Sequence, residues 1–347
     1  SQESDLMTLG KPLHTVSVSR REVLAVGARG TLAATGAGLL GWTSAARADT
    51  YPSKPIRLIV AFPPAGATDI LARAISQRMA ISLGQQIVIE NRPGAGGTIG
   101  LDIAARSPAD GYNAYFCAMT NQAIAEHLYP KAAGSLVRDF DPVGLVANGA
   151  HMLNVHPSVP ARTVSEFVAW LKANDGKVNY ASQGNGTLSH LETELLSQRI
   201  GVRLVHVPYK GSSGALPDLI AGNVSFMFDS VAASMPHVKS GALRALGVAA
   251  TQRLPILPDL PTIAEGGVPG YDVDNWFGVY LPKGSPESAI TRLNDEITKA
   301  LANPELQTLL GRNGFASAHG PASRLAQVTA QEIEKWGRVV KSANVRI

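Results

Sequence analysis

The chain has 347 residues, of which 45% are hydrophobic and 17% charged, so it can bury a large core and is not expected to be disordered. Its net charge of +4 comes without a Lys/Arg-rich stripe interleaved with aromatic residues, which argues against a nucleic-acid partner. The single cysteine, Cys117, cannot form an internal disulfide and is expected to be a small buried strand residue.

The amino-terminal segment has the layout of a signal peptide. The pair Arg20-Arg21 precedes a weakly apolar run over residues 25–45 and an A-x-A cleavage site at residues 46–48. A membrane anchor needs roughly 20 continuous apolar residues, and glycines and an arginine interrupt this run. We therefore predict a twin-arginine signal peptide over residues 1–48, cleaved after export to the periplasm. The rest of the sequence contains no comparable run, so the mature protein is expected to be soluble.

From Ile56 onward, strand-like and helix-like patterns alternate, which predicts helices packed on a mainly parallel sheet. In the first such unit, a buried strand over residues 56–62 leads into a loop of prolines and small residues. The following helix is expected to be capped by Thr68 or Asp69. An α/β fold is therefore expected.

A second unit in mid-chain repeats this pattern. A strand over residues 178–182 leads into a Gly-rich loop over residues 183–186, and Thr187 is expected to cap the next helix. Further strands are predicted over residues 202–207, 224–228 and 243–248, with a helix between each pair.

The division into lobes rests on two candidate crossings. One is the segment over residues 153–156, and the other is a stretch between Val248 and Tyr271 that is rich in proline and glycine. A two-lobed α/β protein usually has its chain pass twice between the lobes. We predict a discontinuous first lobe over residues 49–152 and 271–347, and a second lobe over residues 153–270.

Two loops could bind an anion. In the loop over residues 62–69, small residues let the backbone approach a ligand at the amino end of a helix, where free N–H groups favour negative charge. The loop over residues 182–190 repeats this arrangement and adds the hydroxyls of Thr187 and Ser189. Two such helix starts facing each other would hold a carboxylate from both sides. Each loop alone is equally consistent with an ordinary capped turn.

Four further side chains lie where α/β proteins bind ligands, although each has a structural alternative. Tyr209 and Lys210 follow a predicted strand, so they occupy a strand end. Asp229 also ends a predicted strand, and it either orients a ligand or caps the next helix. His190, on a first helical turn, is either a ligand donor or a surface histidine with a local hydrogen bond.

Catalytic motifs are absent from the sequence. There is no G-x-S-x-G, H-E-x-x-H, C-x-x-C or P-loop motif, so we expect no enzymatic activity, no cofactor and no metal. The segment Gly94–Gly100 superficially matches a dinucleotide fingerprint. Because no βα crossing precedes it, we interpret it as a close-packing turn.

A series of short segments carries a family resemblance. They are YPSKPI (51–56), FPPAGATD (62–69), ENRPGAGG (90–97), DGY (110–112), DF (139–140), HVPYKG (206–211), PDLPT (258–262), GY (270–271) and WFG (276–278). In this order, they make the whole mature chain resemble the Bug receptors, the extracytoplasmic solute-binding proteins of tripartite tricarboxylate transporters.

The resemblance implies a type II periplasmic-binding-protein fold, in which two α/β lobes close on a carboxylated ligand. Its implied ligand-binding residues in this chain are Phe62, Ala65, Gly66, Thr68, Asp69, Thr120, Asn121, Gly184, Thr187, Ser189, His190, Tyr209 and Asp229. The chain departs from the family where Ala65 and Ala67 stand in place of glycines, and in its twin-arginine signal, because these receptors commonly carry a general secretory one.

We therefore expect a monomeric solute-binding receptor that captures an organic acid, aromatic acid or amino acid and delivers it to membrane transporter subunits. Two alternatives belong to other classes. An orphan sensor would use the same capture to signal to a membrane regulator, and gene neighbourhood would distinguish it. An exported hydrolase would need a nucleophile and base, which the sequence does not supply.

Overall fold

The computed structural model describes residues 51–129, 134–343 and 345, all of which belong to one compact unit, Asp49–Ile347. The predicted signal peptide lies outside the described residues, so it stays a prediction. Among the described residues, no helix combines the length and apolar character that crossing a bilayer requires.

The first sheet has six strands in the order β11-β4-β10-β3-β1-β2. Their bounds are β1 Ile56–Val60, β2 Ile87–Asn91, β3 Asn113–Ala118, β4 Phe140–Gly149, β10 Trp276–Pro282 and β11 Phe315–Ser317. The pairs of β1 with β2 and β3 are parallel, but β10 and β4 pair antiparallel. The sheet is therefore mixed, and the prediction of a mainly parallel sheet was wrong. The reason is that β10 enters the sheet when the chain returns from the second sheet, and so runs opposite to β3. The second sheet is mixed as well.

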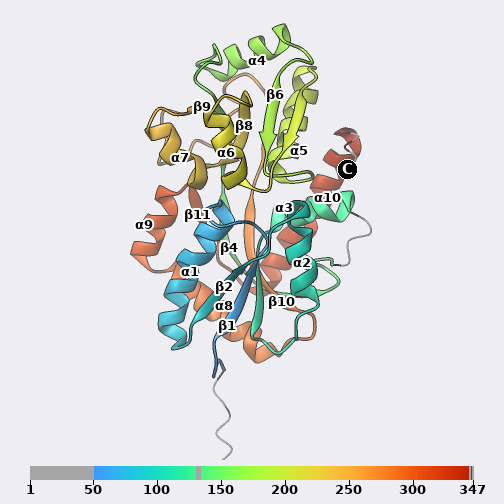
Figure 1. Cartoon of the computed structure of the whole chain (residues 1–347). Helices are drawn as coiled ribbons and strands as arrows, with labels where there is room; N and C mark the ends of the chain where they lie inside the picture. Colours follow the sequence, from blue (N-terminus) through green and yellow to red (C-terminus); the bar gives the residue numbers. More distant parts are fainter. Residues whose placement is uncertain (1–50, 130–133, 344, 346–347) are drawn as a thin grey trace, which may run out of the picture. The chain divides into compact units, whose positions relative to one another are not determined.

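Helices pack around this first sheet (Figure 1). They are α1 Ala67–Leu83, α2 Thr98–Ala105, α3 Met119–Leu128, α8 Glu287–Leu301 and α9 Pro304–Arg312, with a short 3-10 turn at Ala95–Gly97. Leu71, Ile75 and Met79 on α1 are buried in the core, at the helical spacing seen in the sequence. The strand, turn and helix of the first unit thus fold as the pattern indicated.

The second sheet has five strands in the order β7-β6-β8-β5-β9. Its strands and helices are β5 His151–Val155, β6 Asn179–Ser182, β7 Val205–Pro208, β8 Phe226–Ser230, β9 Arg244–Ala249, α4 Val164–Ala173, α5 Leu188–Ile200, α6 Ser212–Ile220 and α7 Val231–Lys239. In Figure 1 these elements are green and yellow, and they are grouped apart from the first sheet. Strands β6 to β9 lie within one to three residues of the predicted positions.

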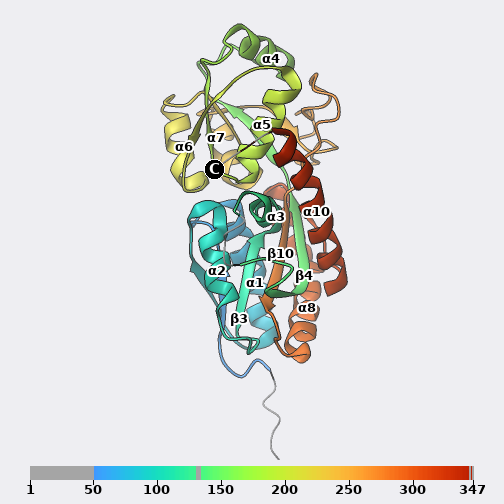
Figure 2. The ribbon, with the colours of Figure 1, turned by 90° about the vertical axis from the view of Figure 1, so that its right-hand side faces the viewer.

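The chain passes from the first sheet to the second between Gly149 and His151, and it returns between Ala249 and Trp276. His151 therefore pairs in the second sheet, although the predicted division placed it in the first lobe. The helix α10, Ala322–Ala343, contributes to both cores, with Leu325 in the first and Trp336 in the second. Figure 2 shows this dark red helix beside β4 and reaching α5. The exact lobe bounds stay a prediction.

Candidate functional site: a buried cavity between two sheets

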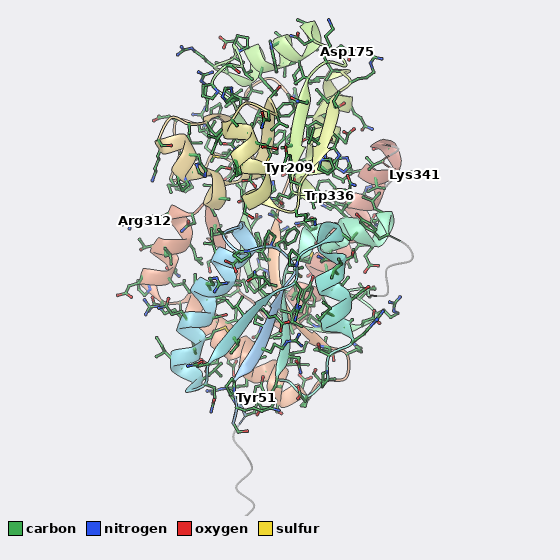
Figure 3. All side chains as sticks on the ribbon, in the orientation of Figure 1. Tyr51, Asp175, Tyr209, Arg312, Trp336 and Lys341 are labelled. Carbon is green, nitrogen blue, oxygen red and sulfur yellow. The ribbon has the colours of Figure 1, made fainter. Side chains whose placement is uncertain are left out.

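Two cavities adjoin where the two sheets face each other. The larger has a volume of about 390 Å³ and the smaller about 10 Å³, and they share Phe62, Pro63 and Gln183. The rest of the larger lining is Pro93, Gly94, Ala95, Gly96, Gly97, Tyr129, Gly184, Asn185, Pro208, Tyr209 and Lys210. The rest of the smaller lining is Gly66, Ala67, Thr68, Ala118, Asn121, Gly211, Ser212 and Asn275. Both halves of the chain therefore enclose one composite site, and Figure 3 shows Tyr209 at the border between them.

The start of α1 opens on the smaller cavity. Gly66 is the N-cap, no side chain caps this end, and the first intrahelical hydrogen bond runs from the Ile70 N–H to the Gly66 carbonyl. The N–H groups of Ala67 and Thr68 precede that bond, so they have no partner within the helix. The expectation that Thr68 or Asp69 caps α1 was wrong, because the helix begins earlier and leaves its positive end exposed to the cavity.

Asp69 holds the loop in shape and does not line either cavity. Its carboxylate accepts hydrogen bonds from the Ala65 N–H at 3.1 Å, from Arg73 at 2.9 Å and from Asn91 at 3.0 Å. Burial alone would raise the pKa of Asp69, but these donors outweigh it and lower the pKa below its ordinary value. The bond to Ala65 also holds that residue at a φ of 66°, a left-handed conformation that is unusual for alanine. Ala65 is exposed and is not among the residues that line either cavity.

In the loop over residues 182–190, most N–H groups donate hydrogen bonds within the loop itself. The N–H of Gln183 donates to Ser189 Oγ at 2.8 Å, and that of Gly186 donates to His190 Nδ1 at 3.1 Å. The Thr187 hydroxyl donates to the Gly184 carbonyl at 2.7 Å. The loop conformation is thus fixed by Thr187, Ser189 and His190, which do not line the larger cavity. Gly184 does line it. Thr187 is the N-cap residue of α5, as predicted, but its side chain makes no capping hydrogen bond. The loop does not offer the free amides that the sequence suggested.

His190 stays neutral in this position. Its ring stacks on that of His206 with centroids 4.0 Å apart, and burial together with the charge of His206 lowers the pKa of His190 to about 3. Burial likewise lowers the pKa of His206 to about 4. Because Nδ1 of His190 accepts the Gly186 N–H, the loop conformation depends on a neutral imidazole.

The helix start that faces α1 across the smaller cavity belongs to α6. Gly211 is its N-cap without a side-chain cap, and the first hydrogen bonds of the helix engage the N–H groups of Gly214 and Ala215. The N–H of Ser212 precedes them and lies at the cavity lining. The sequence pointed to α5 as the opposing helix, and Ser212 was missed.

Asp229 holds the side chains of this second wall in place through hydrogen bonds. It is fully buried, and its carboxylate accepts hydrogen bonds from Gln183 Nε2 at 2.7 Å, Ser212 Oγ at 2.7 Å and Ser234 Oγ at 2.9 Å. It therefore fixes two lining side chains without touching the cavity. Neither of the predicted alternatives, contact with a ligand or helix capping, describes these contacts, because Ser230 is the residue that caps α7.

The start of α3 contributes Asn121 but not Thr120. Asn121 lines the smaller cavity, and its side-chain oxygen accepts the Leu188 N–H at 2.8 Å, which joins the two halves. The hydroxyl of Thr120 accepts the Trp276 N–H at 3.0 Å and lies 3.3 Å from a carboxylate oxygen of Glu332 on α10. Thr120 thus fastens α3 to its neighbours and stands apart from the cavities.

Close contacts across the site indicate a closed conformation. A Cβ added to Gly96 would lie 2.8 Å from the carbonyl oxygen of Asn185, and the Tyr129 hydroxyl donates to that same oxygen at 3.1 Å. A Cβ added to Gly211 would lie 2.6 Å from Pro63. The segment around Gly96, which we interpreted as a packing turn alone, also lines the larger cavity. Its dense glycines were the signal for this close approach.

Comparison with known proteins identifies this architecture. The model of the tripartite tricarboxylate transporter family receptor matches residues 71–345. The chain belongs to this receptor family. A UPF0065 protein from the tcbD-tcbE intergenic region of Pseudomonas sp. strain P51 is 42% identical over 299 residues, which cover 86% of this chain and 89% of that protein.

Solved structures agree with the assignment. The periplasmic binding protein BugD has a TM-score of 0.81 and 32% identity, covering 85% of this chain and 99% of that one. The R. palustris protein Rpa4515 with adipate has a TM-score of 0.82 and 34% identity at the same coverage. The predicted Bug-type resemblance and the two-lobed periplasmic-binding-protein fold are confirmed, and the family is one of receptors, not enzymes.

Proposed function

We propose that this receptor, exported to the periplasm, captures a small carboxylate between its lobes and delivers it to the membrane subunits of a tripartite tricarboxylate transporter. The observation that carries the proposal is the pair of uncapped helix starts, α1 and α6, on opposite walls of one buried cavity. Adipate bound to the related Rpa4515 supports a carboxylate as the ligand class.

The smaller cavity suits a carboxylate group electrostatically. Each helix start contributes a partial positive charge and N–H donors, and a site shielded from water strengthens both. In this closed state the cavity has room for about one water molecule. The carboxylate therefore enters while the lobes are apart and occupies that space as they close.

The larger cavity suits the body of the ligand. Phe62, Pro93 and Pro208 give it apolar walls, while Tyr129 and Asn185 add polar groups. Its volume lies at the lower end of the range for small-molecule sites. Lys210 is the one charged residue of the lining, and no hydrogen bond or ion pair within the described residues engages it. A second negative charge at the far end of the ligand would therefore bind here.

Capture follows from the closing of the lobes. A ligand that contacts both walls binds the closed state more tightly than the open state and shifts the equilibrium toward it. A melting-temperature screen against adipate, malate, succinate, benzoate, nicotinate and glutamate, followed by calorimetry, tests the proposal. Binding of at least one of these acids is expected, and a complete absence of binding would exclude carboxylate capture.

Lys210→Ala is expected to weaken dicarboxylates selectively. Loss of one partly exposed charge pair should raise the Kd of adipate by roughly 3- to 10-fold and leave that of benzoate nearly unchanged. Calorimetric titration of both acids gives the ratio. The exposed Lys239 on α7 lies outside both cavities, so Lys239→Ala is the control. Equal weakening of both acids would assign Lys210 a role in shaping the loop.

A further inference from the structure

Asn275 is a buried amide that the sequence did not single out. It precedes β10, is 4% exposed and lines the smaller cavity. Its Oδ1 has no hydrogen-bond partner among the described residues, while its Nδ2 lies 3.2 Å from Nε2 of His151. An unpaired carbonyl oxygen is a poor lining for an anion site, because it repels a carboxylate.

Behind Asn275 lies a buried acid and base pair. His151 opens β5 and is 2% exposed, and its Nδ1 lies 2.5 Å from Oε1 of the fully buried Glu192 on α5. The Tyr271 hydroxyl donates to the Glu192 backbone carbonyl at 2.7 Å. The other charged group that acts on the pair is Asp229 on β8, and no cation from the described part of the chain does so.

The protonation of His151 decides which way the Asn275 amide points. In the neutral ring, Nδ1–H donates to Glu192 and the Nε2 lone pair accepts from the Asn275 NH₂. The Oδ1 of this lining residue is then left without a partner. When a proton from solvent binds Nε2, that nitrogen becomes a donor. The amide must then turn to present Oδ1 to His151, and its NH₂ group points into the cavity as a donor.

We propose that Asn275 positions the ligand carboxylate, and that its amide is turned by proton uptake on His151, so that the receptor takes up a proton with its anion. This inference rests on the proposed function and adds a coupling to it. Proton uptake places an NH₂ donor and a positive charge near the carboxylate. By reciprocity, a bound carboxylate favours the protonated ring.

The electrostatic surroundings of His151 agree with this direction. Burial opposes a charge on the ring, but the Glu192 carboxylate outweighs it and raises the pKa of His151 above its ordinary value. The protonated ring is therefore present below that raised pKa and is lost as pH rises through it. Affinity is accordingly expected to be highest on the acidic side and to fall at alkaline pH.

Calorimetry on the mature wild-type protein tests the coupling without any variant. Adipate and benzoate are titrated in buffers of different ionisation enthalpy between about pH 6 and pH 9, where both acids are ionised. Uptake of up to one proton per ligand is expected, with Kd rising by up to about tenfold per pH unit above the pKa of His151. Tight binding with no proton uptake across this range would overturn the inference and leave the proposed function standing.

Two variants locate the effect. His151→Gln is expected to abolish the proton uptake. Asn275→Leu is expected to reduce it and to weaken binding at the acidic end by roughly tenfold or more. The exposed His319 lies outside both cavities, so His319→Gln should behave as wild type. Proton uptake that persists in folded His151→Gln would refute the assignment. If that variant does not fold, the wild-type titration still decides the question.

Discussion

Gly96→Ala is expected to weaken carboxylate binding by roughly 10- to 100-fold, because the added methyl keeps the lobes from closing fully. The new Cβ would lie 2.8 Å from the Asn185 carbonyl oxygen, which is backbone and cannot move aside as a flexible side chain would. In the open form one wall of the site is missing, so a variant that closes less completely binds its ligand more weakly. Calorimetry with the tightest acid of the screen measures the change.

Gly84→Ala is the matched control for this variant. Gly84 has the same φ of 64° as Gly96, but a Cβ there would meet no atom within 4 Å. Both variants should lose similar stability, about 1 kcal/mol, from a left-handed alanine. Affinity should fall only in the Gly96 variant. Equal affinities in the two variants would show that the contact with Asn185 does not limit closure.

Asp229→Ala is expected to lower the free energy of unfolding by about 3 to 5 kcal/mol, because two buried hydroxyl donors and one partly buried amide donor lose the carboxylate that accepts from them. These donors belong to Gln183, Ser212 and Ser234. Two of these side chains line the smaller cavity, so ligand binding should be lost as well. Denaturant unfolding and calorimetry check the two effects separately.

Asp175→Ala is the comparison for the loss of an aspartate. Asp175 pairs with Arg203 at 2.9 Å on the exposed end of the second half, far from Tyr209 in Figure 3. Surface pairs of this kind contribute little to stability, so this variant should unfold and bind almost as wild type. If Asp229→Ala were as mild, the buried network around it would not support the cavity wall.

The local pattern of the sequence predicted much of the fold. Alternation of apolar runs placed the strands and helices, and the small residues after β1 marked the helix start that opens on the cavity. The sequence pattern could not predict which two helix starts face each other across the cavity. Whether α5 or α6 faces α1 depends on the strand order β7-β6-β8, and no local pattern encodes strand order.

The side chains missed by the sequence analysis share one physical property, namely that their role depends on partners distant in the chain. Asn275 is buried against His151, 124 residues away. Ser212 is held by Asp229, which looked like a ligand contact or a cap. Conversely, Thr187, Ser189 and His190 carried the right chemistry, but their donors and acceptors are consumed within their own loop. Only the three-dimensional structure shows that these hydrogen-bonding groups already have partners.

Helix α10 ties the hydrophobic cores of both halves into a single structure. Leu325 belongs to one core and Trp336 to the other. If either half unfolds, α10 therefore loses part of its packing, and the other half is destabilised as well. Heat should therefore unfold the protein in one cooperative transition, although two separate sheets would suggest two. Because the same helix packs on both cores, it restrains the opening of the site to a bend, and the ligand-free protein remains one cooperative unit.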